Sequence, residues 1–554
     1  MPSNAEAASL LREIADLLDL QGERFKPEAY RRAARSVESL TEELGAVAGR
    51  HGLRDVPGIG EAIEAKVGEY LATGTIPYLE RLRGEVPPGL LELMRLPGVG
   101  PKTTRRFWTE LGVIDRTSLT GAIDSGRVAG LKGFGARKVE QLTAALAAGS
   151  TGPSSARTPI ESVYGLARSI REALRSRSPT DQVEIAGSLR RFRETVGDLD
   201  FLVTSREPEK VFDVFSALPE VGEVRMRGPT KETVVLRTGL QVDLRVVRPE
   251  EFGAALQYFT GSKDHNVRLR SLARDRGLKI NEYGVFREEE RVGGRTEEEV
   301  YGLLGVPWIP PELREDHGEI DRAREGRLPT PVAANDLVGE LHLHLPENAA
   351  PADLGPLRRR AEQLGLRYVG IVVAAVGGTG TTSQLSPEMR DAIRAPATGR
   401  FRWLEAVEVE PGADPAVVGR LGGAYRILRG PVDGAGPSAA ADRWTGVRLI
   451  AHGPVASSDV RARIERARSA GAALEVGPGA ERLDSVGAGA ARERGVALAI
   501  PTALPGGEAT VVHEIALGFA RRAGATRDEI ANAQPWCEPT AGQTVGGRRR
   551  ATAT

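Results

Sequence analysis

The chain has a single cysteine, few aromatic residues and no long apolar run. With Cys537 alone, a disulfide framework and a cysteine-rich zinc site are excluded, which fits a reducing compartment. No stretch reaches about 18 uninterrupted apolar residues, so the sequence predicts no membrane span. The opening segment "MPSNAEAASLLREIADLLDL" mixes acids and arginine with apolar residues, which is typical of an amphipathic helix rather than a signal peptide. We therefore expect a cytoplasmic protein.

The chain also lacks an excess of charge of either sign. It has 75 Lys and Arg residues against 75 Asp and Glu residues. Any surface that binds a polyanion must therefore be local rather than spread over the molecule. At 554 residues the chain is too long for one hydrophobic core, which predicts several domains.

Three kinds of pattern follow one another along the chain. Residues 5–150 have apolar side chains at helical spacing with short Gly and Pro breaks. Residues 160–320 mix strand-like and helix-like segments, and residues 338–535 repeat an apolar strand followed by an amphipathic helix. The stretches "TGPSSARTP" (151–159) and "EGRLPTPVAAND" (325–336) have the composition of linkers.

A short repeat occurs three times in the helical region. It appears as "VPGIGEAIEAKVGEYL", "LPGVGPKTTRRFWTEL" and "LKGFGARKVEQL", each with a Gly-x-Gly turn before a helix. Amide groups exposed at a helix N-terminus attract phosphate, so this helix-hairpin-helix pattern predicts binding to the DNA backbone without base reading. One copy could be an ordinary helix–turn–helix, but three matched copies favour DNA binding. The glycines are Gly58, Gly60, Gly98, Gly100, Gly133 and Gly135, and the basic residues that follow are Lys102, Arg105, Arg106, Arg137 and Lys138.

Three acids interrupt apolar strands in the middle region. Asp198 and Asp200 lie in "VGDLDFLV", and Asp243 lies in "LQVDLRVV". Side chains two apart on a strand share a face, so we expect the first two to project together. Neighbouring carboxylates repel each other, and a divalent cation with oxygen ligands, Mg²⁺ or Mn²⁺, would relieve that repulsion. For each acid alone a surface position is the simpler interpretation, but the three together predict a site for two metal ions.

The segment "GSLRRF" (187–192) precedes the acid pair. Gly187 allows the backbone to approach a ligand closely, Ser188 offers a hydroxyl and an amide, and Arg191 can fork onto phosphate oxygens. Eleven positions separate this glycine from Asp198. The segment therefore predicts a triphosphate clamp beside the metal site.

These motifs resemble those of the family X DNA polymerases. The matching residues are "GSLRR…GDLD", "VDLR" and "YFTGSKDHNVRLRSLARDRGLKINEYG" (258–284), and "LLDLQGERFKPEAYRRAARSVESL" (17–40) is similar to the family's small lyase-type domain. The order of segments is that of bacterial members, which append a PHP (polymerase and histidinol phosphatase) domain. The resemblance implies that Asp198 and Asp200 bind both metals and that Asp243 helps to activate the primer 3′-hydroxyl.

The same resemblance implies the nucleotide and DNA contacts. Ser188 and Arg191 would hold the β- and γ-phosphates. The residues expected near the incoming sugar are Tyr258, Phe259 and Gly261, the expected base contact is Asn266, and the expected template contact is Arg270. Arg245 and Glu282 match a pair that switches relatives between open and closed forms. This chain departs from relatives at Lys263, which replaces an acid, and at Ile160, which replaces a phosphate-binding arginine.

Lys66 matches the Schiff-base lysine of the lyase-type domain. A Schiff base needs an unprotonated lysine, which nearby cations or burial would favour. Here the companion basic position is Ala62, and Glu61 and Glu64 lie close by in sequence. We therefore expect Lys66 to contact solvent or a 5′-phosphate and the lyase activity to be weak or absent.

The last third resembles a PHP domain that has lost metal ligands. "GELHLHL" supplies His342 and His344, and Glu408 and His452 match two later ligand positions. Other ligand positions are replaced, by Ala374, Ala503 and Pro505 among others. Four ligands of about nine do not assemble a trinuclear cluster, so we expect the nuclease activities to be lost. One residual metal on His342, His344 and His452 stays open.

The predicted fold combines three classes. They are an all-α helix-hairpin-helix N-terminal region, an α+β nucleotidyltransferase palm and thumb, and a C-terminal α/β PHP-like, distorted TIM-type barrel. The predicted domains are 1–85 (lyase-type, binding DNA 5′ ends), 86–156 (fingers-type), 157–249 (palm), 250–322 (thumb-type), 323–337 (linker), 338–538 (PHP-like) and 539–554 (disordered tail).

The resemblance and the motifs together predict a repair polymerase. Its substrates would be gapped or primed DNA and deoxynucleoside triphosphates, with two Mg²⁺ or Mn²⁺ ions in the palm. We expect a monomer at the nucleoid that can interact with other repair proteins. Base excision and end joining both remain candidate pathways. The alternatives are a PHP-type 3′–5′ exonuclease or abasic-site endonuclease, which the lost ligands disfavour, and a non-catalytic DNA-binding scaffold, which the intact acids disfavour.

Overall fold

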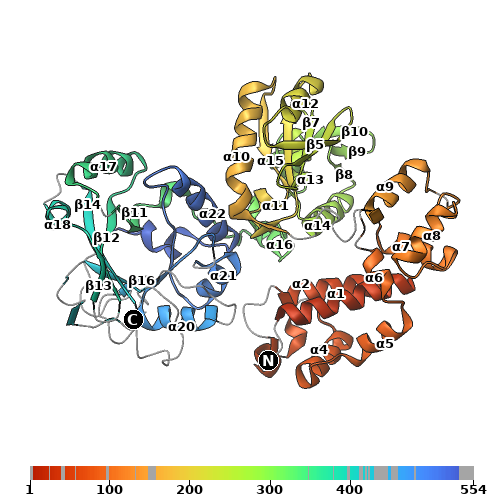
Figure 1. The fold of residues 1–554 in the computed structure, drawn as a ribbon, viewed down its shortest axis with the longest axis horizontal. Helices are drawn as coiled ribbons and strands as arrows, with labels where there is room; N and C mark the ends of the chain where they lie inside the picture. Colours follow the sequence, from red (N-terminus) through yellow and green to blue (C-terminus); the bar gives the residue numbers. More distant parts are fainter. Residues whose placement is uncertain are drawn as a thin grey trace. The chain divides into compact units, whose positions relative to one another are not determined.

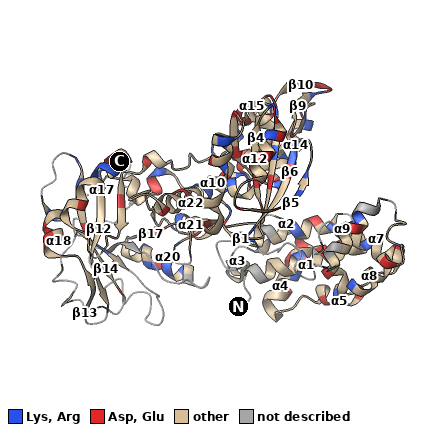
Figure 2. Cartoon of the chain, turned by 45° about the horizontal axis from the view of Figure 1, so that its top comes forward, with Lys and Arg blue, Asp and Glu red and all other residues tan. Residues whose placement is uncertain are grey.

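The computed structural model forms two compact units, residues 1–155 and 156–554 (Figure 1). It describes residues 4–23, 25–38, 44–50, 52–56, 58–94, 96, 99–131, 133–147, 157–346, 348–377, 380–395, 400–410, 413, 416–417, 421, 424–428, 447–450, 459–479 and 482–535. No helix among these residues is both long and apolar enough to cross a membrane. Acidic and basic residues are interspersed along both units (Figure 2).

The N-terminal unit is helical. Its elements are α1 (Asn4–Gln21), α2 (Lys26–Glu38), α3 (Leu44–Arg50), η1 (Leu53–Asp55), α4 (Glu61–Thr73), α5 (Pro77–Glu85), α6 (Gly89–Leu93), α7 (Pro101–Leu111), α8 (Arg116–Asp124) and α9 (Ala136–Ala147). Leu11, Ile14 and Leu18 are fully buried along one face of α1, which packs against α2, α5 and α7. Their spacing of three and four residues is that of an amphipathic helix.

The second unit begins with a five-stranded sheet. Its strand order is β2 (Gln182–Ile185), β4 (Leu199–Thr204), β7 (Gln241–Val247), β6 (Lys231–Leu236) and β5 (Val221–Arg227), with β4 and β7 parallel and the other pairs antiparallel. The helices α10 (Ile160–Arg177) and α12 (Pro208–Ser216) share a core with Phe201 and Val203, whereas Leu202 packs against α13 (Phe252–Thr260). This alternation along β4 places helices on both faces of the sheet.

A smaller subdomain follows. Its elements are α14 (Lys263–Arg274), the antiparallel strands β8 (Lys279–Asn281), β9 (Gly284–Arg287) and β10 (Glu290–Gly293), then α15 (Glu297–Leu303), η2 (Pro311–Leu313) and α16 (Glu319–Arg324). Three short elements complete the region: β1 (Thr158–Pro159), α11 (Gly187–Arg190) and β3 (Thr195–Val196). A separate core containing Leu269, Tyr301 and Ile309 holds the subdomain together.

The C-terminal region is a parallel sheet with surrounding helices. Its strands are β11 (Gly339–Leu343), β12 (Tyr368–Gly377), β14 (Arg402–Val409), β15 (Tyr425–Leu428), β16 (Val447–Ile450), β17 (Ala473–Glu475) and β18 (Leu498–Ala499), and β13 (Gly380–Gln384) pairs antiparallel with β12. The helices are η3 (Ala334–Asp336), η4 (Pro351–Asp353), α17 (Leu354–Gln363), α18 (Pro387–Arg394), α20 (Asp459–Ala470), α21 (Ser485–Glu493), α22 (Glu508–Arg522), η5 (Arg527–Glu529) and η6 (Ala531–Ala533).

Side chains link the first and last strands of this sheet. The Asn532 amide donates to the carbonyls of Gly339 and Ile500 at 2.9 and 2.7 Å. The Glu340 carboxylate accepts from the backbone and the hydroxyl of Thr502, both at 2.7 Å. The strand ladder therefore curves until its two ends meet through buried polar contacts, in the manner expected of a distorted barrel.

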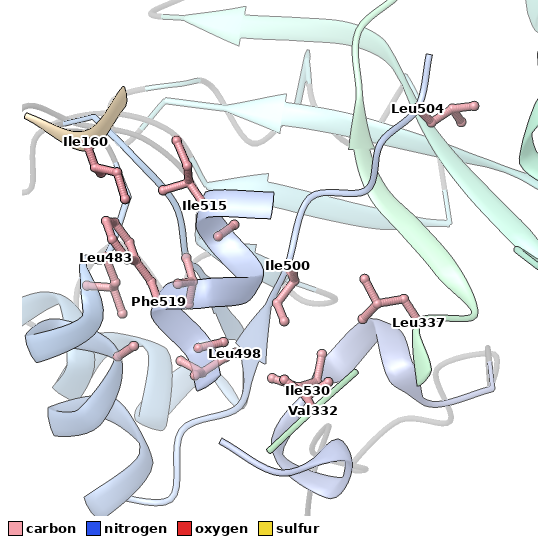
Figure 3. Close-up of a cluster of buried hydrophobic side chains, with 14 of the residues drawn as sticks. Ile160, Val332, Leu337, Leu483, Leu498, Ile500, Leu504, Ile515, Phe519 and Ile530 are labelled. Atoms are coloured by element: carbon pink, nitrogen blue, oxygen red, sulfur yellow. The ribbon is translucent and has the colours of Figure 1, made fainter. Parts of the chain in front are cut away.

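One hydrophobic core spans the palm and the C-terminal region. Ile160 of α10 lies beside Leu483, Ile515 and Phe519, the last two from α22 (Figure 3). Val332, within the segment that the sequence analysis assigned to a linker, is also buried in this core. Its amide donates to the carbonyl of Ala525 at 2.8 Å, so this segment is packed against the C-terminal region.

Candidate active site

Two of the three predicted acids lie opposite each other on neighbouring parallel strands. Asp200 in β4 is the register partner of Asp243 in β7. Asp198 differs from the expectation, because β4 begins at Leu199 and Asp198 occupies the bend before it. The acids are thus brought together by strand pairing and a turn, rather than by alternation along a single strand.

The three carboxylates interact unfavourably in the absence of a cation. Burial raises the pKa of Asp200 to about 7, with further contributions from the charges of Asp198 and Asp243. The pKa of Asp198 is also raised, first by burial and then by Asp243. Clustered buried carboxylates with elevated pKa values are typical of sites that exchange protons or bind cations.

Two of the partners of Asp243 that the sequence analysis missed lie on the neighbouring strand. The Lys231 ammonium lies 2.6 Å from Asp243 Oδ2, and the Thr233 hydroxyl donates to Oδ1 at 2.7 Å. Both come from β6, which pairs antiparallel with β7 and places Thr233 opposite Asp243. The available signal was a lysine at the start of the strand "KETVVL", since a partly buried charged residue requires a partner.

Gly187 is required by the position of Asp200. Its φ is +63°, and a Cβ atom built on it would lie 2.3 Å from Asp200 Oδ2. The glycine therefore lets the carboxylate approach the start of α11, where Ser188 is half-buried. The segment "GSLRRF" and the acids therefore form one continuous site. Gly187 was expected to make room for a ligand, but the group that lies against it is the carboxylate of Asp200.

Arg191 donates to two protein groups. Its Nε donates to Glu315 Oε1 at 2.9 Å, and one terminal nitrogen donates to the carbonyl of Thr260. The neighbouring Arg190 forms a forked pair with Glu297, at 2.8 and 2.9 Å, and also donates to the Thr260 hydroxyl at 2.6 Å. These partners were missed because they lie 69 to 124 residues further along the chain.

The residues expected to contact the nucleotide lie at the end of α13, at Gly261 directly after it, and in α14. The Asn266 side chain accepts from Gln257 at 2.6 Å and donates to the carbonyl of Tyr258 at 2.7 Å, which fixes its orientation. Gly261 is buried with a φ of +71°. Arg270 is exposed on α14, as a DNA-contacting residue must be.

Arg245 and Glu282, both described, form no ion pair in this structure. The Arg245 guanidinium lies 4.3 Å from the centre of the Phe259 ring instead. Ile160, where the resemblance led us to expect an arginine, is fully buried in the core shared with the C-terminal region. Its apolar character therefore has a packing role.

The three glycine turns each lead into a helix of the N-terminal unit. Gly60 and Gly100 are the residues directly before α4 and α7, and Gly135 directly precedes α9. Gly58 and Gly133 have φ values near +90°, while Gly98 lies outside the described residues. Lys102 is exposed beside the second turn. Arg106 pairs with Glu110 at 2.7 Å, so it is less available to DNA than expected.

The Lys66 ammonium has two local contacts. It donates to the carbonyl of Ala62 at 2.8 Å and lies 4.7 Å from the centre of the Tyr78 ring. The ammonium group is therefore held between the backbone of α4 and the ring of Tyr78 in α5.

Histidines of the C-terminal region meet one carboxylate. His342 Nε2 and His344 Nε2 lie 2.8 and 3.0 Å from Glu408 Oε1, and the three side chains could hold a metal ion. Although burial opposes it, hydrogen bonds to Glu408 and Glu475 raise the pKa of His342 to about 10. The Glu475 carboxylate also lies 3.3 Å from the Arg482 guanidinium. His452 lies outside the described residues.

The donor chemistry of the palm acids fits a divalent cation. Asp198 and Asp200 have raised pKa values, and the three side chains offer only oxygen donors, which suits Mg²⁺ or Mn²⁺. In this structure the donor atoms of the three acids do not all lie within 4.8 Å of one another, as those of His342, His344 and Glu408 do. The sole cation that contacts an acid of the trio at hydrogen-bonding distance, within the described part of the chain, is Lys231. A bound metal would supply the missing positive charge.

Comparison with known proteins gives the family. Models for a DNA polymerase beta thumb, a helix-hairpin-helix domain and a SAM-like helix-hairpin-helix tandem match residues 255–315, 2–76 and 90–148. A DNA polymerase/3′-5′ exonuclease PolX of Bacillus subtilis is 34% identical, over 72% of this chain and 71% of its own length.

More distant relatives are polymerases named lambda. Those of Rattus norvegicus and Arabidopsis thaliana are 26% and 22% identical, over 56% of this chain, and the alignments span 56% and 62% of their own lengths. The thumb and helix-hairpin-helix matches, the paired acids and the extent of the Bacillus match lead to one conclusion: the chain belongs to the bacterial family X DNA polymerases that carry a C-terminal PHP domain.

Proposed function

We propose that this chain is a template-directed DNA polymerase that fills short gaps during DNA repair. The observation that carries the proposal is the pairing of Asp200 with Asp243, with Asp198 beside them and the "GSLRRF" loop against Asp200. The names of its relatives, a PolX and two lambda polymerases, point to the same chemistry. Two helix-hairpin-helix matches supply a means of holding the DNA backbone.

The three acids would hold Mg²⁺ or Mn²⁺. When bound, such ions offset phosphate charge and lower the pKa of an attacking hydroxyl. Asp243, oriented by Lys231 and Thr233, would face the primer 3′-hydroxyl. The nucleotide's phosphates would lie against Ser188 and Arg191, and its sugar against Tyr258, Phe259 and Gly261. Asn266 would meet the incoming base, and Arg270 the template strand.

We further propose that the C-terminal domain has lost nuclease activity. The support is the replacement of ligand positions by Ala374, Ala503 and Pro505, together with Arg482 beside Glu475. A residual metal on His342, His344 and Glu408 would lack the second ion that phosphodiester cleavage by this type of centre uses. An exonuclease as the main activity is therefore disfavoured.

The remaining predictions concern the cell. We place the protein at the nucleoid in the cytoplasm, because its proposed substrate is chromosomal DNA. A monomeric state and interactions with other repair proteins stay predictions.

Extension of a primer across a one-nucleotide gap tests the proposal. Wild type should add one nucleotide, and Asp243→Ala should reduce the rate by at least about a thousandfold while DNA binding is retained, because a ligand of the reacting centre is removed. Binding without extension by either protein would favour a DNA-binding scaffold instead.

A further inference from the structure

Helix α22, the last α-helix of the described C-terminal region, contacts the "GSLRRF" segment directly. Arg522, at the end of α22, donates to Glu315 Oε1 at 2.7 Å and to the carbonyl of Arg191 at 3.3 Å. Glu315 Oε1 is the same atom that accepts from Arg191 at 2.9 Å. One carboxylate oxygen is therefore shared by an arginine of the clamp and an arginine of the neighbouring domain.

A second contact of α22 is steric. A Cβ atom built on Gly518 would lie 2.1 Å from the ring of Phe192, so the ring sits directly on the helix backbone. Phe192 has a φ of +52°, a conformation that a bulky residue adopts only when its surroundings hold it there. Its other side faces Tyr164, with 5.5 Å between the ring centres. The end of the "GSLRRF" loop is thus held between α10 and α22.

The charges around Glu315 decide what Arg191 can do. Arg193 lies 3.8 Å from the second oxygen of Glu315, so three arginines surround this acid. Glu315 and Arg522 are both largely buried, at 13% and 9% side-chain exposure, which limits screening by solvent. If Arg522 were absent, Glu315 would pair more strongly with Arg191, and the surroundings of the "GSLRRF" segment would carry one positive charge less.

We propose that Arg522 is a positioning residue for the polymerase reaction: by sharing Glu315 with Arg191, it keeps Arg191 available to the triphosphate of the incoming nucleotide. The C-terminal domain thereby forms a structural part of the polymerase site, independently of any metal or nuclease chemistry of its own. This inference rests on the proposed polymerase function.

The test is the kinetics of one-nucleotide gap filling by the full-length Arg522→Gln variant. We expect the KM for the nucleotide to rise roughly two- to thirtyfold, the range for residues that act on a site through a neighbour, with kcat within about twofold. DNA affinity, measured by fluorescence anisotropy, should be unchanged. Arg494→Gln is the matched control, because Arg494 pairs with Glu465 at 3.5 Å wholly within the C-terminal domain.

A double-mutant cycle with Glu315→Gln identifies the route. If Arg522 acts through Glu315, its replacement should raise the KM much less in the Glu315→Gln background than in wild type. Equal effects in both backgrounds, or an unchanged KM for Arg522→Gln, would overturn the inference. These outcomes would leave the proposed function intact, because the wild type would still fill the gap. A wild type that adds no nucleotide would instead refute the proposed function.

Two milder variants test the inference if Arg522→Gln does not fold. Arg522→Lys retains the charge but not the fork, so its KM should fall between those of wild type and Arg522→Gln. Gly518→Ala should push on Phe192 and raise the KM, whereas Gly489→Ala in α21, where the added methyl group meets no atom within 4 Å, should not. A wild-type KM for both Arg522→Lys and Gly518→Ala would also contradict the inference.

Discussion

Replacing Asp200 by asparagine should stabilise the metal-free protein, and the gain should depend on pH. Burial raises the pKa of Asp200 to about 7 from its ordinary 3.8. Between pH 3.8 and about pH 7 the folded state binds more protons than the unfolded state, so the free energy of unfolding falls as the pH rises through this range. At about 1.4 kcal/mol per pH unit, the full loss is at most about 4 kcal/mol. Because the residue is partly exposed, we expect about 2 to 4 kcal/mol.

The assay is chemical unfolding with EDTA present, at pH 5 and pH 8. Asp200→Asn cannot ionise, so its free energy of unfolding should exceed that of wild type at pH 8, and this gain should be about 2 kcal/mol larger than at pH 5. Mg²⁺ or Mn²⁺ should stabilise wild type more than the variant. Asp181→Asn is the control, because Asp181 is exposed at the start of the same sheet. A gain that is equal at both pH values, or absent, would refute the reasoning.

Three further variants test other parts of the site. Gly187→Ala should lower the rate of nucleotide insertion at least about tenfold, because the methyl group and the positive φ displace the carboxylate of Asp200; gap filling at the wild-type rate would count against this. Glu408→Gln removes the acceptor shared by two histidines and should cost the C-terminal domain about 3 kcal/mol by denaturant unfolding, with nucleotide insertion at 25 °C retained; an unchanged unfolding midpoint would be inconsistent with it. Lys66 should form no borohydride-trapped adduct with a 5′-deoxyribose phosphate end, and an adduct that disappears in Lys66→Ala would show this expectation to be wrong.

Local pattern and motif spacing predicted the elements that carry the site. The apolar runs around Asp200 and Asp243 indicated strands, and the structure pairs those strands with the two acids in register. The Gly-x-Gly repeats indicated helix starts, and α4, α7 and α9 begin directly after them. In each case the signal lies within about ten residues, which is the range over which periodicity and turn chemistry act.

The contacts missed are those between residues far apart in sequence. Arg522 lies 331 residues from Arg191, and Glu315 lies 124 residues from it, so neither contact leaves a periodic signal. Lys231 could be recognised as unusual in a strand, but its pairing with Asp243 depends on the register of β6 against β7. Asp198 was placed in a strand because a two-residue spacing does not distinguish a strand from the bend that precedes one.

One gel assay tests the central claim directly. The claim is that nucleotide transfer depends on the palm acids and that the C-terminal domain does not cleave DNA. The substrate is a primer labelled at its 5′ end whose 3′ end borders a one-nucleotide gap. It is incubated with Mn²⁺, nucleotides and either wild type or Asp198→Ala. Wild type should lengthen the primer by one nucleotide, and Asp198→Ala should leave its length unchanged. A primer shortened by Asp198→Ala, or lengthened by it at the wild-type rate, would contradict the account.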